Sequence, residues 1–328
     1  MENPGIDFFK IENHFKETEH IPSIPIFENH RKEVPMFTIA IPTYKRADYL
    51  KEALDSAINQ ATDIPYEIIV VDNNPERNDE TELLMETYRH IPNLRYYKNS
   101  KNIGMTGNWN RLFTLAKTNW VIMLHDDDML SPYFIKVIND IIATISDVDI
   151  IQTGKVKDKT QLSTVLNHYR ISQIHLRNLK WYFKGGAPTG CALKKDTIFQ
   201  LGGFNEAFFP NQDYCFFSLA ASQAKIMYVA NKLTYYRWEI NVSQKIDVRR
   251  KVIINDILLQ KSILEKLDSK NHISQKMLSA MIAVRNDRAK ALNPKFELID
   301  NKLFKLPEIS FLWKFIYKIY MRFLLIMD

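Results

Sequence analysis

The chain has little cysteine: Cys191 and Cys215 are the only two in 328 residues. Domains that replace a large core with disulfides need several cysteines at regular spacings, so this sequence excludes a disulfide scaffold. Two isolated thiols suit a reducing compartment, and we therefore expect a cytoplasmic protein.

Glycine is also scarce. Five of the nine glycines lie within one short stretch, namely Gly185, Gly186, Gly190, Gly202 and Gly203. Because glycine is the residue that tolerates unusual backbone angles and close approach, this stretch is where we expect the chain to need them.

Long apolar runs are absent as well. No window of 18 residues is free of charge, so we predict no membrane span. Glu2 and Asp7 lie among scattered apolar residues, unlike the cationic start and apolar centre of a signal peptide. The net charge of +6 is spread along the chain, and we expect no nucleic-acid partner.

The rest of the composition is that of an ordinary globular protein, with 46% hydrophobic and 25% charged residues. A chain of 328 residues is long enough for one large α/β domain with additions, or for two domains.

Residues 120–130, Trp-Val-Ile-Met-Leu-His-Asp-Asp-Asp-Met-Leu, are the most informative stretch. The unbroken apolar run 120–124 predicts a strand buried on both faces, as in a parallel sheet. Asp126–Asp128 follow it directly, so they lie at the carboxyl end of that strand, where open α/β sheets bind ligands.

Three adjacent carboxylates repel one another, by about 1 kcal/mol per pair at 4 Å in water. Hard divalent cations with oxygen ligands relieve that cost. The run therefore favours a metal site, and the alternative is a solvated acidic turn that caps the next helix.

Four strands alternate with helical patterns, at residues 37–41, 67–71, 94–97 and 120–124. Strands that alternate with helices in this way predict βαβ units and a parallel sheet. Further along, Ile226–Val229 and Leu233–Tyr236 look like two paired strands that turn at Asn231.

Six short motifs lie in order between residues 36 and 245, about two-thirds of the chain. They are Ile41–Arg46 (Ile-Pro-Thr-Tyr-Lys-Arg), Val70–Asn74, Asn102-x-Gly104, Leu124–Asp128, Gly202–Glu206 and Gln212-Asp213. Each is weak alone, but in this order and spacing the chain resembles the family 2 glycosyltransferases of the GT-A fold. The resemblance implies a Rossmann-like α/β domain with a mixed, mostly parallel sheet flanked by helices, followed here by a helical C-terminal region.

The resemblance also implies which residues bind a nucleotide-sugar donor. They are Pro42, Thr43, Tyr44, Arg46, Asp72, Asn102, Gly104, Asn108, Asp126 and Asp127. The family counterpart of Asp72 accepts the imide N–H of uracil, which makes a UDP-sugar the expected donor. By composition alone, Asp72 also fits an ordinary turn before Asn-Asn-Pro, Tyr44 and Arg46 fit a surface helix start, and Asn102–Asn108 fits a capped turn.

A D-x-D-type motif in the family holds Mn²⁺ or Mg²⁺ on the donor diphosphate, where the ion acts as a Lewis acid. Here Asp126 and Asp128 are the implied metal ligands. Family motifs often begin one residue earlier, where this chain has His125, so the role of each aspartate stays open. Glu239 stands where the family commonly has a histidine near the metal, and it is either a ligand or the loss of one.

Asp213 corresponds to the catalytic base, which removes the proton of the acceptor hydroxyl. The alternative is a helix N-cap, a position that aspartate favours. Gln212 is expected to bond the acceptor, and Thr189 and Gly190 to line the acceptor side.

Residues 309–327 combine a strongly apolar composition with cations at i, i+4 and i+8: Lys314, Lys318 and Arg322. An in-plane helix on an anionic membrane surface has this pattern. The alternative is a helix packed on its own domain or on a second subunit.

The predicted organisation is an N-terminal arm (1–36), a GT-A domain (37–245), a helical region (246–305) and an amphipathic helix (306–328). For the arm, a disordered tail is the alternative.

The predicted function is metal-dependent, inverting transfer of a hexose from a nucleotide sugar to a hydroxyl of a growing, lipid-linked glycan. The expected setting is bacterial surface polysaccharide synthesis, peripheral on the inner face of the cell membrane. One rival is a sugar nucleotidyltransferase, which wants a glycine-rich phosphate loop that Pro42–Arg46 lacks. The other is a nucleotide- or glycan-binding module without catalysis.

Overall fold

The computed structural model describes residues 7–29, 32–163, 169–181, 183, 186–238, 245–269 and 271–326. The chain divides into two compact units. A sheet unit comprises Phe9–His175 and Phe183–Glu239, and a helical unit comprises Met1–Phe8, Leu176–Tyr182 and Ile240–Asp328.

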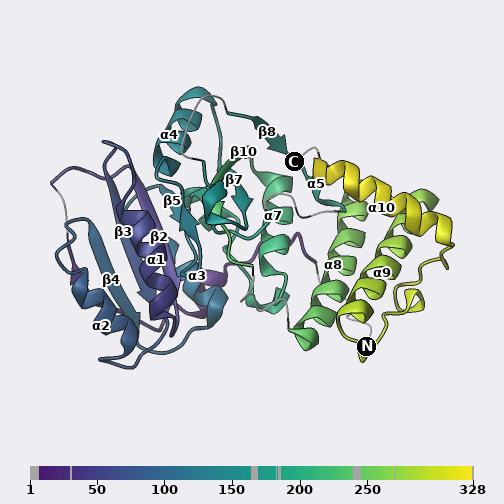
Figure 1. Ribbon diagram of the computed structural model, residues 1–328, viewed down its shortest axis with the longest axis horizontal. Coiled ribbons are helices and arrows are strands. Elements are labelled where there is room, and N and C mark those ends of the chain that lie inside the picture. The colour runs from purple at the N-terminus through teal and green to yellow at the C-terminus, as the bar shows by residue number, and fades with distance from the viewer. Residues whose placement is uncertain are drawn as a thin grey trace. The chain divides into compact units, whose positions relative to one another are not determined.

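Ten strands form one sheet in the described part of the sheet unit, in the order β1-β4-β3-β2-β5-β9-β7-β10-β6, with β8 beside β10 (Figure 1). Their bounds are β1 Ser23–Glu28, β2 Phe37–Thr43, β3 Tyr66–Asp72, β4 Leu94–Asn99, β5 Trp120–Met123, β6 Met129–Leu130, β7 Ile150–Val156, β8 Ile171–Ile174, β9 Cys191–Lys194 and β10 Ile226–Tyr235. This mixed α/β fold confirms the predicted fold class.

Strands β2 to β5 are parallel and are joined by α1 (Ala47–Ile58), α2 (Glu80–Thr87) and α3 (Gly104–Leu115). Strands β3 and β4 lie in turn on one side of β2, whereas β5 lies on its other side. The strand order therefore reverses between β2 and β5. In open α/β sheets, ligands bind outside the carboxyl ends of the strands at such a reversal.

Every residue of β2 and of β3 is buried, which explains why their sequences are nearly continuous apolar runs. Helix α1 buries one face, formed by Leu50, Ala53, Leu54 and Ala57. The other helical elements in the described part of this unit are η1 His14–Glu17, α4 Phe134–Thr144, η2 Lys159–Gln161, α6 Lys195–Gln200, η3 Glu206–Phe208 and α7 Gln212–Gln223.

The second half of the sheet differs from the predicted pattern. Strand β9 inserts between β5 and β7 and runs antiparallel to both. The predicted strand pair at 226–236 is wrong, because these residues form the single strand β10. The register of β10 against β7 shifts after Val229 and again after Lys232. The residues at this irregularity are polar, like those of a turn, although the strand continues through them.

Residues 9–36, which were predicted to belong to an arm, are part of the sheet unit. Strand β1 pairs antiparallel with β4 at the edge of the sheet. The backbone amide of His14 donates to the carbonyl of Gly202 (2.9 Å), so η1 is joined to the turn after α6.

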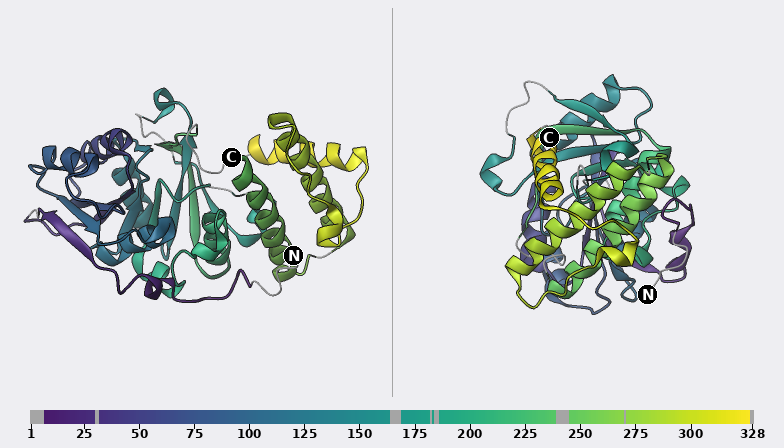
Figure 2. Two further views of the ribbon diagram at one scale, coloured as in Figure 1. Left: turned by 90° about the horizontal axis from the view of Figure 1, so that it is seen from below. Right: turned by 90° about the vertical axis from the view of Figure 1, so that its right-hand side faces the viewer.

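The helical unit contains α5 (Leu176–Leu179), α8 (Ile246–Lys266), α9 (His272–Leu292), η5 (Asn301–Phe304) and α10 (Phe311–Ile326). Helix α10, in yellow in Figure 2, packs against α9, which in turn packs against α8. The core includes Ile257, Met281 and Tyr317. No helix in the described part of the chain has both the length and the apolar character needed to cross a bilayer.

Candidate active site

The carboxyl ends of β2, β3 and β4 and the segment that follows β5 meet at one edge of the sheet. They bring Thr43, Asp72 and Lys98 to the same edge as Asp126–Asp128. This is the edge at which the strand order reverses, so the topology places the predicted acidic motif at the position where open α/β sheets generally bind ligands.

Asp126 is held by the loop after β2. Its Oδ2 accepts from the Thr43 hydroxyl (2.8 Å), and its Oδ1 lies 3.4 Å from Nη1 of Arg46. Burial raises the pKa of Asp126 to about 7, although the charge of Arg46 opposes the rise. The fold therefore makes ionisation of this carboxyl costly.

Asp127 and Asp128 contact opposite sides of the motif. Oδ2 of Asp127 accepts from Arg46 Nη1 (2.8 Å), while Oδ1 of Asp128 accepts from the backbone amide of Arg237 (2.8 Å). Oδ2 of Asp128 is buried and has no well-formed hydrogen bond within the described residues. Burial, and then the charge of Asp127, raise the pKa of Asp128 well above its usual range.

His125 joins the acidic cluster. One ligand atom from each of His125, Asp127 and Asp128 lies within 4.8 Å of the other two. The imidazole stacks on Trp109, with ring centroids 5.3 Å apart, and burial lowers the pKa of His125 to about 4. A neutral imidazole is the form that binds metals.

This donor set fits a divalent cation. It offers oxygen atoms, which Mg²⁺ and Mn²⁺ prefer, together with a neutral nitrogen and a buried oxygen that lacks a hydrogen bond. The predicted ligand set was Asp126, Asp128 and Glu239. Asp126 lies outside the geometric group and Glu239 lies outside the described residues, so that assignment stays a prediction.

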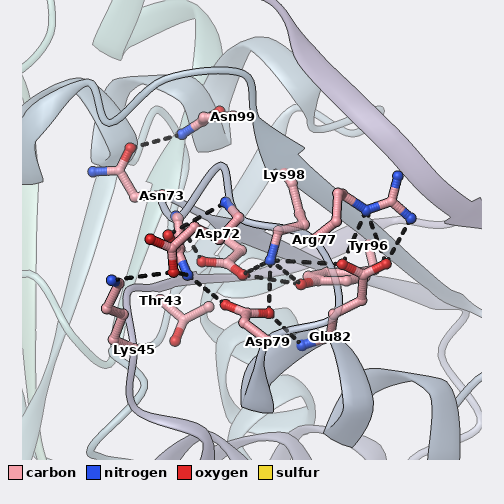
Figure 3. Close-up of polar contacts among 12 residues, drawn as sticks. Thr43, Lys45, Asp72, Asn73, Arg77, Asp79, Glu82, Tyr96, Lys98 and Asn99 are labelled. Carbon is pink, nitrogen blue, oxygen red and sulfur yellow. Dashed lines mark hydrogen bonds and ion pairs between the residues drawn. The ribbon is translucent and has the colours of Figure 1, made fainter.

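Asp72, the predicted base-binding residue, lies in a buried ionic network at the ends of β3 and β4 (Figure 3). Its Oδ2 accepts from Lys98 Nζ (2.8 Å) and from the Tyr96 hydroxyl (3.0 Å), and its Oδ1 accepts from the Asn74 amide (2.8 Å). Neither Asp72 nor Lys98 is exposed by more than 2%. Burial raises the pKa of Asp72, and the ammonium of Lys98 opposes the rise.

Lys98 is the centre of this network. Its Nζ also donates to Asp79 Oδ1 (2.8 Å) and lies 3.9 Å from Glu82. Arg77 in turn holds Glu82 with three hydrogen bonds of 2.6 to 3.0 Å. The loop after β3 is therefore fixed to the sheet by buried charges. The prediction that Asp72 contacts a base stays untested, because the side chain has no exposed surface here.

The predicted residues of the loop before α3 meet the same edge. Asn102 accepts from Asn73 Nδ2 (2.9 Å), and Gly104 has a φ of +76°. Asn108 is buried and bonds the Val71 carbonyl and the Asn99 side chain. Asn108 therefore ties α3 to β3 and β4, whereas Asn102 and Gly104 lie nearer the surface.

Of the predicted residues at the end of β2, Pro42 is buried within the strand and Tyr44 is 44% exposed. Lys45, which follows, has a φ of +53°, a left-handed conformation that is uncommon for residues other than glycine. The loop that carries Arg46 is thus held in an unusual backbone conformation, as often occurs at binding sites.

Two predicted acceptor-side residues support the cluster. The Thr189 hydroxyl accepts from the backbone amide of His125 (3.1 Å), and the Gly190 amide donates to the Met123 carbonyl (2.7 Å). A Cβ on Gly190 would lie 1.9 Å from the Thr234 hydroxyl oxygen, so glycine is required for this close approach.

Asp213, the predicted base, is the second residue of α7, and its Oδ1 accepts from the Tyr214 amide (2.8 Å). Gln212 is buried, and its Oε1 has no hydrogen bond within the described residues. Burial lowers the pKa of Lys155 on β7, and the nearby charges of Asp128 and Asp213, with Cys191, oppose this. Asp213 and Asp128 thus both favour the charged form of Lys155.

The sequence arguments missed three residues of this site as functional candidates. His125 had a signal, because it stands where family motifs begin. Lys98 had none, because nothing in β4 marks a lysine as buried. Arg237 donates from its guanidinium to the Asp127 carbonyl (2.9 Å) and to Glu52 (3.0 Å), contacts that depend on the position of β10.

The chain is similar to known glycosyltransferases in both sequence and fold. Residues 38–202 match the sequence profile described as "Glycosyl transferase family 2". A hyaluronan synthase of Pasteurella multocida is 30% identical over 109 residues, which are 33% of this chain and 11% of that protein. The chain spans less than two thirds of the length of the curated relatives it matches.

Two solved structures share the fold. Residues 1–349 of TarS from S. aureus, in complex with UDP-GlcNAc, superpose with a TM-score of 0.53 at 18% identity, covering 78% of this chain and 83% of that one. The mannosyltransferase PcManGT from Pyrobaculum calidifontis, in complex with GDP-Man and Mn²⁺, gives a TM-score of 0.53 at 14% identity, covering 84% and 81%.

Proposed function

Because this chain belongs to glycosyl transferase family 2, we propose that it transfers a hexose from a UDP-sugar to a hydroxyl group of a growing glycan, with inversion at the anomeric carbon. The observation that carries the proposal is the carboxylate cluster at the strand-order reversal, with a buried Asp128 oxygen that lacks a hydrogen bond. A divalent cation bound to a nucleoside diphosphate would supply the positive charge that balances these carboxylates and a ligand bond for the Asp128 oxygen.

The donor would lie along the carboxyl edge of β2 to β5, where the predicted donor residues gather. Support comes from solved structures of the same fold that hold UDP-GlcNAc or GDP-Man. Tyr44 is exposed enough to contact a base or ribose, and Arg46 carries the charge that a diphosphate needs.

His125, Asp127 and Asp128 would hold the divalent cation, Mn²⁺ or Mg²⁺, together with Asp126 if it turns from Thr43. When bound, such an ion neutralises negative charge on the leaving diphosphate. The chain itself contributes the fixed orientation of these ligands, through the Arg237 amide and the Thr189 hydroxyl.

Asp213 would act as the base. In the single displacement we propose, the acceptor oxygen forms a bond to the anomeric carbon while the bond from that carbon to the diphosphate oxygen breaks. The hydroxyl proton passes to the Asp213 carboxylate, and Gln212 holds the acceptor beside it.

A panel of nucleotide sugars, with release of the nucleoside diphosphate as the readout, tests this function. We expect Asp213→Asn to lower turnover by roughly 10²–10⁴-fold, because a base contributes about that much, while UDP binding persists. The exposed Asp158 provides a matched control, since its carboxylate bonds Thr160 and, within the described residues, pairs with no member of the cluster. Unchanged turnover in Asp213→Asn overturns the assignment of the base.

We further propose that the acceptor is lipid-linked, in bacterial surface polysaccharide synthesis, and that α10 holds the enzyme on the cytoplasmic face of the membrane. Helix α10 has two apolar faces. Tyr317 is buried, with Trp313 and Met321 packed on the same core. A second face is exposed and consists of Phe311, Leu312, Phe315, Ile316, Ile319 and Phe323.

Cations flank the exposed face of α10. Lys318 and Arg322 are exposed, whereas Lys314 lies 3.2 Å from Asp287. An apolar face bordered by cations suits the boundary of an anionic bilayer, which takes the aromatic side chains while its headgroups pair with the cations.

Sedimentation with vesicles tests this attachment. The double variant Phe311→Ser/Phe315→Ser is expected to lose binding to vesicles that contain phosphatidylglycerol. Ile273→Ser, an equally exposed change in α9, is the matched control and should bind as the wild type does. Retained binding by the double variant, with circular dichroism confirming that both proteins are folded, rejects the membrane role of α10.

A further inference from the structure

Arg46 places one nitrogen between two carboxylates of the cluster. Its Nη1 is 2.8 Å from Asp127 Oδ2 and 3.4 Å from Asp126 Oδ1. The arginine side chain is 34% exposed, against 9% for Asp126 and 15% for Asp127. The guanidinium therefore reaches over the two carboxylates from the solvent side.

The neighbouring cations have other partners. Lys45, adjacent in sequence, lies 3.4 Å from Glu76. The Arg237 guanidinium donates to Glu52 and to the backbone carbonyl of Asp127, not to a carboxylate of the cluster. Within the described residues, the ion pairs of Asp126 and Asp127 are thus made by Arg46.

A divalent cation and this guanidinium would compete for the same carboxylates. Mg²⁺ binds oxygen at about 2.0–2.1 Å, so an ion on Asp127 would lie close to the guanidinium and repel its charge. The buried Oδ2 of Asp128, which Arg46 does not contact and which lies 3.9 Å from His125 Nδ1, is a further oxygen that such an ion could bind.

We propose that Arg46 is an internal counter-ion of the acidic cluster, which an incoming divalent cation displaces, and that the released guanidinium then binds the donor diphosphate. The planar fork of arginine pairs with phosphate oxygens as well as it does with carboxylates, so the side chain exchanges one anionic partner for another. The backbone of Lys45, the preceding residue, is left-handed (φ +53°), a conformation often found at binding sites.

This exchange deepens the proposed function and rests on it, because it assumes that a cation and a diphosphate share the site. When the metal binds without nucleotide, Arg46 competes with it for the carboxylates. When the metal binds together with a nucleotide, Arg46 contributes to binding by pairing with the diphosphate. Removal of its charge must then shift the two affinities in opposite directions.

Calorimetric titration of Arg46→Met tests the exchange. We expect Mn²⁺ without nucleotide to bind roughly tenfold more tightly than to the wild type, and UDP in the presence of Mn²⁺ to bind roughly tenfold more weakly. Uridine, which lacks phosphate, should bind both proteins equally. Lys45→Met removes a neighbouring cation that pairs elsewhere and should leave the Mn²⁺ affinity unchanged.

Thermal unfolding in a chelator gives a second readout. Arg46→Met should unfold at a lower temperature than the wild type without metal, because the carboxylates lose their counter-charge, and added Mn²⁺ should close that gap. Arg46→Lys keeps the positive charge but lacks the planar guanidinium. Its Mn²⁺ affinity should therefore return to the wild-type value, whereas its UDP affinity should recover only in part.

Two results are distinguishable. If the wild type binds neither Mn²⁺ nor UDP, the proposed function itself fails. If the wild type binds both, but Arg46→Met weakens Mn²⁺ binding or leaves it unchanged, Arg46 only supports the fold of the cluster and the exchange is wrong.

Discussion

Asp72 and Asp128 lie at the same edge of the sheet, are each exposed by 1% or less, and differ in what their oxygens contact. Both oxygens of Asp72 accept hydrogen bonds, including one from a buried lysine. Asp128 has a backbone amide on one oxygen and no hydrogen bond within the described residues on the other.

The difference separates a structural network from a binding site. A buried carboxylate is tolerated when its charge is matched inside the protein, as Lys98 matches Asp72 and Asp79. In the cluster, the partly exposed Arg46 pairs with Asp126 and Asp127 but not with Asp128, and burial raises the pKa of Asp126 and of Asp128. The charge of this cluster is matched less completely inside the protein than that of Asp72, and that is why we assign the cation and the diphosphate to it.

The largest expected effect is on stability and comes from the network around Asp72 and Lys98, whose charges are matched inside the protein. Lys98→Met should lower the free energy of unfolding by about 3–5 kcal/mol, because it leaves buried carboxylates without their counter-charge. Urea unfolding measures this. The exposed Lys51, which pairs with Asp55 on α1, is the control, and Lys51→Met should leave the unfolding midpoint unchanged. If the two variants unfold alike, the network is not what holds the loop after β3.

Asp128→Asn should act on binding. We expect Mn²⁺ affinity to fall roughly 100-fold, about 2.7 kcal/mol, because an amide supplies no charge to the ion. Electron paramagnetic resonance of free Mn²⁺ measures the affinity directly. Asp79→Asn removes a carboxylate from the matched network at the same edge and should leave Mn²⁺ binding intact; equal losses in the two variants would show that both clusters serve the ion.

The third effect depends on pH. Because the folded pKa of Asp126, about 7, lies above its unfolded value, this carboxyl destabilises the metal-free fold as pH rises from about 4 to 7. Asp126→Asn cannot titrate, so its stability relative to the wild type should rise by roughly 1–2 kcal/mol between pH 5 and pH 8. Thermal unfolding in a chelator at the two pH values checks this. A gain that is equal at both would contradict the raised pKa.

The parallel half of the fold could be predicted from the sequence, because strands that are buried on both faces consist of continuous apolar runs, such as Phe37–Ile41 and residues 120–124. It failed where a strand is irregular or inserted. β10 was divided at Asn231, and β9 was missed, because four residues after Gly190 carry no period of their own.

The sequence identified the family, which the match over residues 38–202 confirms. It also located the acidic motif at residues 126–128, whose role as a metal site stays a prediction. It could not reveal that Lys98 holds Asp72 or that Arg46 spans two aspartates, because these contacts join side chains 26 and 81 residues apart. The roles of Asp72, Asp213 and Glu239 stay predictions.

Titration of the wild-type protein with UDP, with and without Mn²⁺, tests the central claim most directly. A carboxylate cluster whose charge is matched incompletely inside the protein predicts tight binding of UDP with Mn²⁺ and much weaker binding without it, since the diphosphate would then face the carboxylates unshielded. Equal affinity in the two titrations would contradict the account.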